Sequence, residues 1–249
     1  MEESQIPENT SRNTHHKVAE LVLEDGESMK VLDIPCGAGA LTYRLLKLGK
    51  EVTSADIENL LMFKHERFHI ADMNTPLPFQ NSEFDAVVCI DGIEHIENPF
   101  AFIRECNRIL KSNGKLIIST PNITSMRSRW RWFLTGHHNK CKSPLNENKP
   151  SPLHHIHMMD FPKIRYILHT SGFGINRVGA NRIKPVSWIY AIFYPFSFFK
   201  TWLVYRKEEK DDQQRRVNRQ IIKTMFSLPV FFGETIIVKA IKQNDLALS

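Results

Sequence analysis

The sequence lacks the features that mark secreted and membrane-spanning proteins. Its 249 residues include four cysteines without paired spacing: Cys36, Cys89, Cys106 and Cys141. A disulfide framework is therefore not expected, and reduced thiols in the cytoplasm are the default. The N-terminus is polar, with Glu2 and Glu3, and no signal peptide is predicted.

The sequence also lacks internal repeats. A chain of this length can bury one substantial core, so one domain with additions is expected. Lys and Arg outnumber Asp and Glu, 33 to 27, which gives a formal net charge of +6. This excess favours acidic partners without identifying them.

A predicted strand, a glycine-rich turn and a predicted helix follow one another near the N-terminus. An apolar run from Val31 carries Asp33 and breaks at Gly37 and Gly39, and a helix is predicted over 40–49. Such a turn brings backbone N–H groups and a helix N-terminus close to a ligand, and a side chain at either glycine would block that approach. The pattern is typical of nucleotide-binding elements.

The dinucleotide fingerprint of nicotinamide dehydrogenases is incomplete here. That fingerprint is G-x-G-x-x-G, and Thr42 stands where its third glycine would be. Further predicted strands end in acids, at Asp56, Asp72 and Asp91. Asp56 follows the turn by about 20 residues, the distance at which an acid can hydrogen-bond the hydroxyls of a ribose.

Five segments between about residues 30 and 122 carry a family resemblance: DIPCGAG, SADI, ADM, FDAVVCIDGIEHIENP and LKSNGKLIISTPN. In this order and spacing they resemble the class I S-adenosylmethionine-dependent methyltransferases, particularly the small-molecule O- and C-methylating branch. The resemblance implies an α/β, Rossmann-like, doubly wound sheet of seven strands, the last one antiparallel. One departure is Pro35, which replaces the first glycine of the family's D-x-G-x-G-x-G and removes a backbone donor.

The resemblance also implies the roles of individual residues toward S-adenosylmethionine. Carried over position by position, these are Asp33, Gly37 and Gly39 for the methionine end, Asp56 for the ribose, Asp72 and Met73 for the adenine, and Ile90 as a further cofactor contact.

A second element, Asp91-Gly-Ile-Glu94-His95, resembles the E-x-x-E-H motif of ubiquinone-pathway and small-RNA terminal 2′-O-methyltransferases. Those enzymes bind a divalent cation with this motif and a later histidine, for which His155 is the best positional match. The resemblance therefore implies a metal site of Asp91, Glu94, His95 and His155, although Asp91 is shorter than the usual Glu. Without metal, His95 or His155 is the expected general base beside Glu94, and a purely structural role for all of them stays open.

The remaining chain divides into segments. Residues 1–29 are expected to hold a flexible start and an amphipathic helix over 13–24, and residues 30–181 the cofactor-binding core. Helices are predicted over 57–67, over 98–111 with Asn113-Gly114 ending it, and over 161–171; strands are predicted over 174–181 and 233–241, with a tail to 249.

Residues 125–152 interleave basic and aromatic side chains: Arg127, Arg129, Trp130, Arg131 and Trp132. The segment is predicted to form a lid over the substrate, whose basic lining would favour an anionic group such as a phosphate or carboxylate. The alternative is a solvated helix whose tryptophans face the core.

Residues 182–232 form a hydrophobic insertion between the two final strands, too long for a structureless loop. Its stretch 186–205 is aromatic and flanked by cations. A membrane crossing is not expected, because the last strand must return to the same sheet. A segment lying in the membrane interface, at the inner face of the membrane, is one interpretation; a cap over the substrate or a dimer contact is the other.

The sequence thus predicts a cytoplasmic methyltransferase that acts on a hydroxyl of a small-molecule, lipid-linked or glycan acceptor. RNA methylation, with the lid holding phosphates and stacking bases, is an alternative. A non-catalytic, cofactor-binding scaffold is another.

Overall fold

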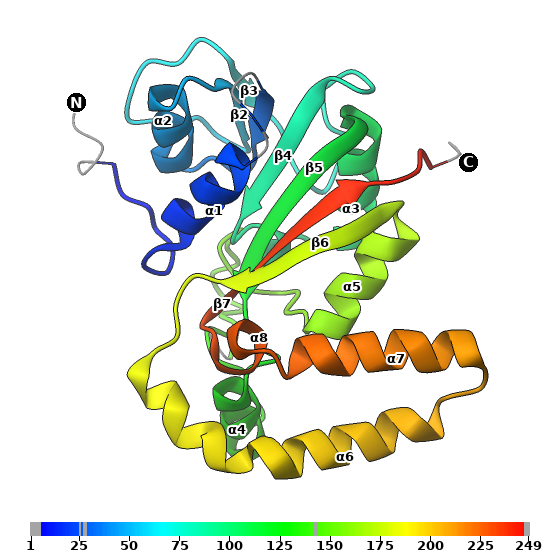
Figure 1. Ribbon diagram of the computed structural model, residues 1–249. Helices are drawn as coiled ribbons and strands as arrows, with labels where there is room; N and C mark the ends of the chain where they lie inside the picture. The colour runs from blue at the N-terminus through cyan, green and yellow to red at the C-terminus, as the bar shows by residue number, and fades with distance from the viewer. Residues whose placement is uncertain (1–5, 25, 27–28, 142–143, 247–249) are drawn as a thin grey trace.

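A seven-stranded sheet forms the centre of the protein (Figure 1). The structure is a computed structural model that describes residues 6–24, 26, 29–141 and 144–246. The strands lie in the order β3-β2-β1-β4-β5-β7-β6, and β7 runs antiparallel to both of its neighbours. Their bounds are β1 Lys30–Asp33, β2 Glu51–Asp56, β3 Phe68–Ile70, β4 Phe84–Ile90, β5 Leu110–Pro121, β6 Phe173–Ala180 and β7 Thr235–Lys242. The predicted Rossmann-like, doubly wound sheet with an antiparallel last strand is confirmed.

Two hydrophobic cores cover the two faces of this sheet, because successive side chains of a strand point to opposite faces. Leu32 and Val87 belong to the larger core, and their neighbours Val31 and Val88 belong to the smaller one. Helices α3 (Pro99–Ile109) and α5 (Phe161–Thr170) cover the larger core, and α1 (Thr14–Leu23) and α2 (Ala40–Lys47) the smaller one, as Figure 1 shows.

The helix predicted over 57–67 is wrong, since this segment is a loop. Strand β3 runs parallel to β2 and pairs with its last residues, with Ser54 opposite Phe68. The connection from the end of β2 to the start of β3 is therefore short and needs no helix. The loop instead folds over the glycine-rich turn, where the Met62 N–H donates to the Ala38 carbonyl at 3.2 Å.

The predicted end of the helix over 98–111 is also wrong. Its start is as expected, with the Asn98 side chain accepting a hydrogen bond from the Ala101 N–H and Pro99 in the first turn. The helix ends at Ile109, however, and Leu110 enters β5 directly because it pairs with Phe84. Asn113 and Gly114 therefore lie inside β5, at an irregularity of its pairing with β4.

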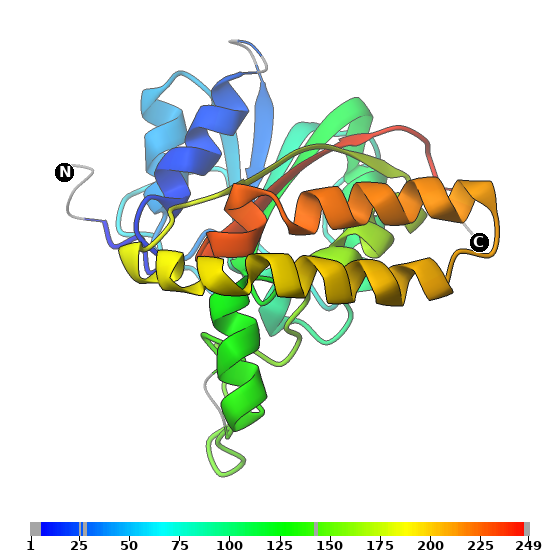
Figure 2. The same cartoon turned by 60° about the horizontal axis from the view of Figure 1, so that its bottom comes forward.

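The insertion after β6 is helical. It contains η3 (Pro185–Phe193), α6 (Tyr194–Lys207), α7 (Asp212–Met225) and α8 (Leu228–Phe232). Helices α6 and α7 form an antiparallel hairpin along one edge of the molecule (Figures 1 and 2). Short α8 joins it to the larger core through Phe231, which is fully buried. None of the residues of α6 is buried.

Helix α4 (Met126–Thr135) follows β5 and lies in the segment 125–152. Figure 2 shows it projecting from the body beneath η3 and α6. Trp130 of α4 stacks on Phe193 of η3, with ring centroids 5.0 Å apart. The tryptophan thus faces the insertion, while Trp132 on the same helix is exposed.

Candidate active site

The acidic residues singled out in the sequence lie along one edge of the sheet. Asp33 ends β1, Asp56 ends β2, and Asp91 follows β4. Because these three strands are parallel neighbours, their carboxyl ends meet at the same edge. This edge is where ligands bind in open α/β sheets.

The glycine-rich turn is fixed to the end of β2. The Cys36 N–H donates to the Ala55 carbonyl at 3.0 Å, and the Gly37 N–H donates to Asp56 Oδ2 at 2.8 Å. Gly37 has a φ of +50°, and a Cβ added there would meet no heavy atom within 4 Å. The backbone at Gly37 therefore faces open space, as a turn that approaches a ligand requires.

Gly39 serves a different purpose. Its φ is +88°, and an added Cβ would lie 2.6 Å from Leu61 Cδ2 and 2.7 Å from Phe63 Cε1. Its missing side chain therefore makes room for the loop 57–67 rather than for open space.

Asp33 is buried beneath this turn. Its Oδ2 accepts a hydrogen bond from Thr42 Oγ1 at 2.6 Å, and the same hydroxyl lies 2.8 Å from Ser54 Oγ. Burial raises the pKa of Asp33 from its ordinary value of 3.8 to about 7. This carboxyl holds β1, β2 and α2 together from the inside.

The buried carboxyl of Asp33 predicts a pH-dependent stability. Between about pH 4 and 7 the folded chain holds a proton that the unfolded chain has released, so the free energy of unfolding falls as the pH rises, then levels off. Asp33→Asn keeps the shape but cannot ionise, and is expected to make this fall shallower; part of the fall remains because burial also raises the pKa of Glu94, to about 8. Urea unfolding at several pH values measures it; equal slopes in both proteins would contradict the prediction.

The other predicted cofactor residues lie along the same edge. Asp56 Oδ1 accepts from the Ile57 N–H at 2.8 Å, and exposed Asp72 accepts from the N–H and the amide of Asn74. Met73 is partly buried against the larger core, and Ile90 is buried at the end of β4. Each lies at or next to the carboxyl end of its strand.

Asp91 is held by β5. Its N–H donates to the Ser119 carbonyl and side chain, and Ser119 Oγ donates to Asp91 Oδ1 at 2.7 Å. Asp91 has a φ of +44° and precedes the short helix η2 (Ile93–His95). Asp91 and Glu94 are therefore not on one face of a single helical turn.

Glu94 is completely buried beside the same strand. Its Oε2 accepts from Thr120 Oγ1 at 2.9 Å, whereas its Oε1 accepts no hydrogen bond from any residue that the structure describes. Burial, followed by the negative charge of Asp91, raises the pKa of Glu94 to about 8. An unsatisfied buried oxygen of this kind is costly unless a proton or a cation joins it.

The two histidines meet beside Glu94. His95 Nδ1 lies 3.0 Å from the His154 carbonyl, which can only accept, so Nδ1 carries the proton and Nε2 the lone pair. The rings of His95 and His155 meet edge to face with centroids 4.7 Å apart. Ligand atoms of Glu94, His95 and His155 all lie within 4.8 Å of one another.

The structure thus brings together three of the four predicted metal ligands. Mixed carboxylate and imidazole ligands suit zinc, manganese or iron better than magnesium alone. Among the described residues, Asp91 does not join the group that could hold an ion.

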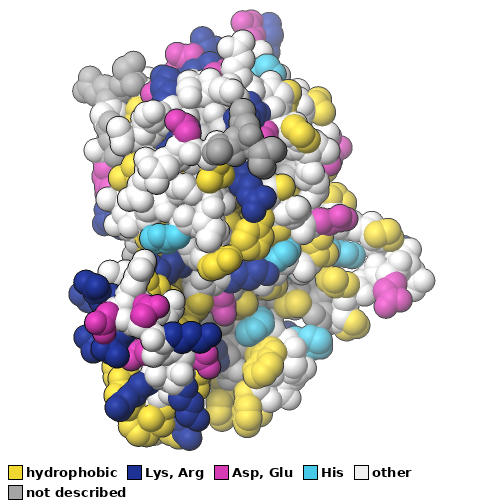
Figure 3. All heavy atoms as spheres, turned by 90° about the vertical axis from the view of Figure 1, so that its right-hand side faces the viewer, with side chains coloured by type: hydrophobic (Ala, Val, Ile, Leu, Met, Phe, Trp, Pro, Cys, Tyr) yellow, Lys and Arg dark blue, Asp and Glu magenta, His cyan; other side chains and the backbone are white. Residues whose placement is uncertain are grey.

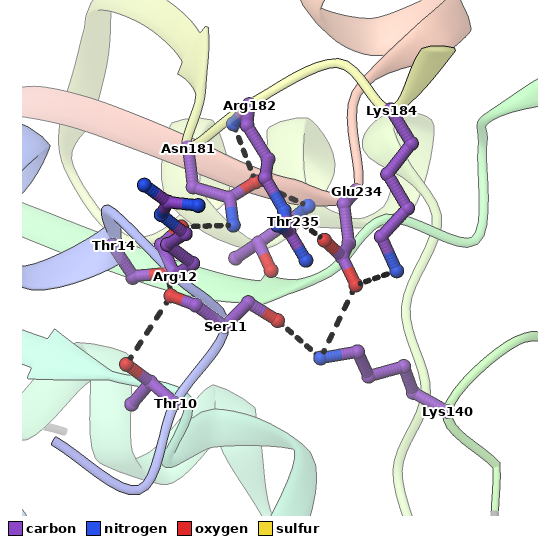
Figure 4. A network of polar contacts seen from close by, with 10 residues as sticks. All are labelled: Thr10, Ser11, Arg12, Thr14, Lys140, Asn181, Arg182, Lys184, Glu234 and Thr235. Carbon is purple, nitrogen blue, oxygen red and sulfur yellow. Dashed lines mark hydrogen bonds and ion pairs between the residues drawn. The ribbon is translucent and has the colours of Figure 1, made fainter. Parts of the chain in front are cut away.

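A charged network next to this site was not predicted. Figure 4 shows Lys140, Arg182 and Lys184 around the Glu234 carboxylate. The distances to its oxygens are 2.6 Å from Lys184 Nζ, 2.7 Å from Arg182 Nε and 3.7 Å from Lys140 Nζ. Burial opposes ionisation of Glu234, but these cations outweigh it and lower its pKa. Arg182 and Lys184 are near neighbours in the sequence, but Lys140 and Glu234 lie far from them, so no local pattern connects the four residues.

Comparison with known proteins gives the same fold and a partial sequence match. Residues 32–118 match the model of a methyltransferase domain. A ubiquinone biosynthesis O-methyltransferase of Xanthomonas oryzae pv. oryzae is 37% identical over 106 residues, which cover 38% of this chain and 44% of that protein. The match therefore spans less than half the length of this relative.

Two solved structures are similar over almost the whole chain. A SAM-dependent methyltransferase from Archaeoglobus fulgidus superimposes with a TM-score of 0.56 at 17% identity, over 92% of both chains. An S-adenosylmethionine-dependent methyltransferase from Mesorhizobium loti gives a TM-score of 0.52 at 14% identity, over 90% of this chain and 96% of that one. At such identities the likeness is one of fold.

Proposed function

We propose that this chain, whose core is that of a class I S-adenosylmethionine-dependent methyltransferase, transfers a methyl group to a hydroxyl of a small-molecule or lipid-linked acceptor. The observation that carries the proposal is that Glu94 and His95, just past β4, meet His155 of the loop before α5, at the edge where Gly37 faces open space. Donor binding and proton removal would then take place side by side.

The donor half of the edge fits the cofactor. S-adenosylmethionine would supply an electrophilic methyl group on its sulfonium. Gly37 offers an open backbone, and Asp56, already oriented by the Gly37 and Ile57 N–H groups, offers a carboxylate for the ribose. Asp72 and Met73 lie next along the edge for the adenine. Buried Asp33 supports the turn from below.

The acceptor half supplies a base. A hydroxyl becomes a good nucleophile when a neighbouring group takes its proton, and alignment with the methyl group provides much of the remaining rate enhancement. His95 is suited to this role because the His154 carbonyl fixes its tautomer, which places the basic lone pair of the ring on Nε2.

The proposal is tested first by calorimetry with S-adenosylhomocysteine and then by following its release with a panel of hydroxyl acceptors, catechols and phosphorylated sugars included. Micromolar binding together with turnover of at least one acceptor is expected. Asp56→Ala should weaken the binding at least tenfold, since one charge-assisted hydrogen bond contributes about 1.5–3 kcal/mol. An absence of heat with the wild-type chain would end the proposal.

A divalent cation also fits the cluster. Glu94, His95 and His155 would hold it, and the buried Glu94 Oε1 would gain a partner. A bound cation would lower the pKa of an acceptor hydroxyl.

This proposal predicts that EDTA lowers the turnover rate at least tenfold and that added Zn²⁺ or Mn²⁺ restores it. Because binding requires ionised Glu94, metal affinity should rise with pH up to about 8. A rate unchanged in EDTA would reject the metal and leave His95 as the base.

The lipid-linked acceptor is proposed from the surface of η3 and α6. No described helix is both long and apolar enough to cross a bilayer. Yet Ile189, Ile192 and Phe196 are 70%, 76% and 64% exposed, and apolar patches of this kind often mark interaction sites. Figure 3 looks onto the other end of α6, at the turn of the α6–α7 hairpin, where hydrophobic side chains on the lower edge lie among Lys, Arg, Asp and Glu. Exposed apolar side chains on a helix that also carries cations suit the interface of an anionic membrane.

Flotation with anionic liposomes tests this surface. The triple variant Ile189→Ser, Ile192→Ser and Phe196→Ser is expected to reduce the bound fraction several-fold, because its buried apolar area on the membrane is lost. Leu48→Ser with Ile70→Ser removes exposed apolar side chains elsewhere and serves as the control. Equal partition of all three proteins would remove the membrane contact.

A further inference from the structure

We infer that a basic cavity beside the proposed active site binds a phosphate group carried by the acceptor. This inference rests on the proposed function and assigns the class of its substrate. The cavity has a volume of about 140 Å³ and lies among α4, η3 and the start of β7. Its lining is polar and includes four cationic side chains: Arg127, Arg131, Lys140 and Lys184.

The described part of the chain does not neutralise the charge of this cavity. Glu234 is its only carboxylate among the described lining residues, and it is engaged by Lys140, Lys184 and, from behind, Arg182. Among the residues that the structure describes, neither Arg127 nor Arg131 forms an ion pair or a hydrogen bond through its guanidinium. Two guanidinium groups on one cavity wall are therefore left for an anion.

The spacing of these two arginines suits a shared ligand. Arg127 and Arg131 are four residues apart on α4, so they lie on the same face of the helix. Guanidinium groups bind phosphate and carboxylate oxygens through paired hydrogen bonds. A dianionic phosphate matches the surplus of positive charge better than a singly charged carboxylate does.

The rest of the lining is built for polar contact. Asn122, Ser125 and Ser187 are buried there. The Asn122 amide donates to the Val230 and Gly233 carbonyls, and its Oδ1 accepts from the Ser125 N–H. These bonds fix the floor of the cavity between the end of β5 and the start of β7. A ligand would therefore meet a preformed site.

The cavity also adjoins the proposed reaction centre. Thr120 of β5 holds Glu94, and Asn122 follows two residues later, about 7 Å along an extended chain. A phosphate in the cavity would thus place a hydroxyl a few bonds away near His95. This distance favours a small phosphorylated molecule, or the phosphate-linked head of a lipid.

Binding of inorganic phosphate, measured by calorimetry on the full chain, tests the inference. Millimolar affinity is expected for the wild-type protein, with at least a tenfold loss in the double variant Arg127→Gln and Arg131→Gln. Arg104→Gln removes an exposed charge outside the cavity and should stay within twofold of wild type. Equal phosphate affinity in the double variant and the wild type, or an equal loss in the control, would overturn the inference.

Two further measurements are made. The first identifies the source of the phosphate, and the second separates the cavity from the proposed function. Glucose 1-phosphate and dihexanoyl phosphatidic acid are each used to displace inorganic phosphate; displacement by either supports a phosphorylated acceptor, soluble or lipid-borne, and displacement by neither overturns it. S-adenosylhomocysteine affinity should be unchanged in the double variant. If neither the wild type nor the double variant binds S-adenosylhomocysteine, the proposed function is contradicted. Phosphate binding tests the cavity alone.

Discussion

Replacing His95 with alanine is expected to lower the turnover rate by roughly 10²- to 10⁴-fold, the usual contribution of a positioned general base. The ring lies next to Glu94 and His155, and its protonated Nδ1 faces the His154 carbonyl. The loss should fall on the turnover number and leave cofactor affinity within twofold, because His95 is not among the residues proposed to contact the cofactor. Release of S-adenosylhomocysteine, with the acceptor that wild type uses fastest, is the measurement.

His137→Ala provides the matched control, since His137 is exposed and outside the cluster. Its rate should equal that of wild type. A His95→Ala protein that binds cofactor and keeps more than a tenth of the wild-type rate would show that the hydroxyl loses its proton without this ring.

The second large effect concerns the insertion. Phe231→Ala is expected to lower the free energy of unfolding by about 3–5 kcal/mol, as for other fully buried aromatic side chains. Phe231 packs against the rings of Tyr194, Phe226 and Phe232, with centroids 4.8 to 5.4 Å apart, and belongs to the larger core under the sheet. For a chain of this size the midpoint of thermal unfolding should fall by about 6–20 °C.

Phe133→Ala is the control for this loss, because Phe133 is 72% exposed on α4 and should change stability by less than about 0.5 kcal/mol. Calorimetry on both variants checks the comparison. A single transition that shifts as a whole is expected for Phe231→Ala. A separate early transition, with the main one unmoved, would show that the helices after β6 unfold independently of the sheet.

Much of the fold could be predicted from the sequence because its signals are local. Short apolar runs that end in acids indicated β1, β2 and β4, and the Asn98-Pro99 pair indicated the start of α3. The helix predicted over 57–67 was wrong because this segment only has to connect the end of β2 to β3, which pairs with the last residues of β2. That long-range pairing cannot be read from the local sequence. Asn113-Gly114 has the composition of a helix end, but pairing of Leu110 with Phe84 overrides it.

The candidate site was also predictable in part. Glu94, His95 and His155 do meet, and the motif together with a later histidine contained that information. The departure of Asp91 toward Ser119 was not visible, because it depends on a left-handed backbone and a neighbouring strand. The Glu234 network joins residues almost 100 positions apart and has no sequence pattern at all.

Asn181 ties together the two ends of the insertion. Its side-chain oxygen accepts from the N–H groups of Arg182 and Thr235, and its amide donates to the Arg12 carbonyl. The chain thus leaves the sheet and rejoins it where these hydrogen bonds of Asn181 meet, next to Glu234. The α6–α7 hairpin beyond Asn181 can therefore change in length without shifting the register of β6 and β7. The part of the sheet edge proposed to bind the methyl donor would also stay as it is. On the proposed function, a change in the hairpin would therefore alter the acceptor side of the site and leave the cofactor side as it is.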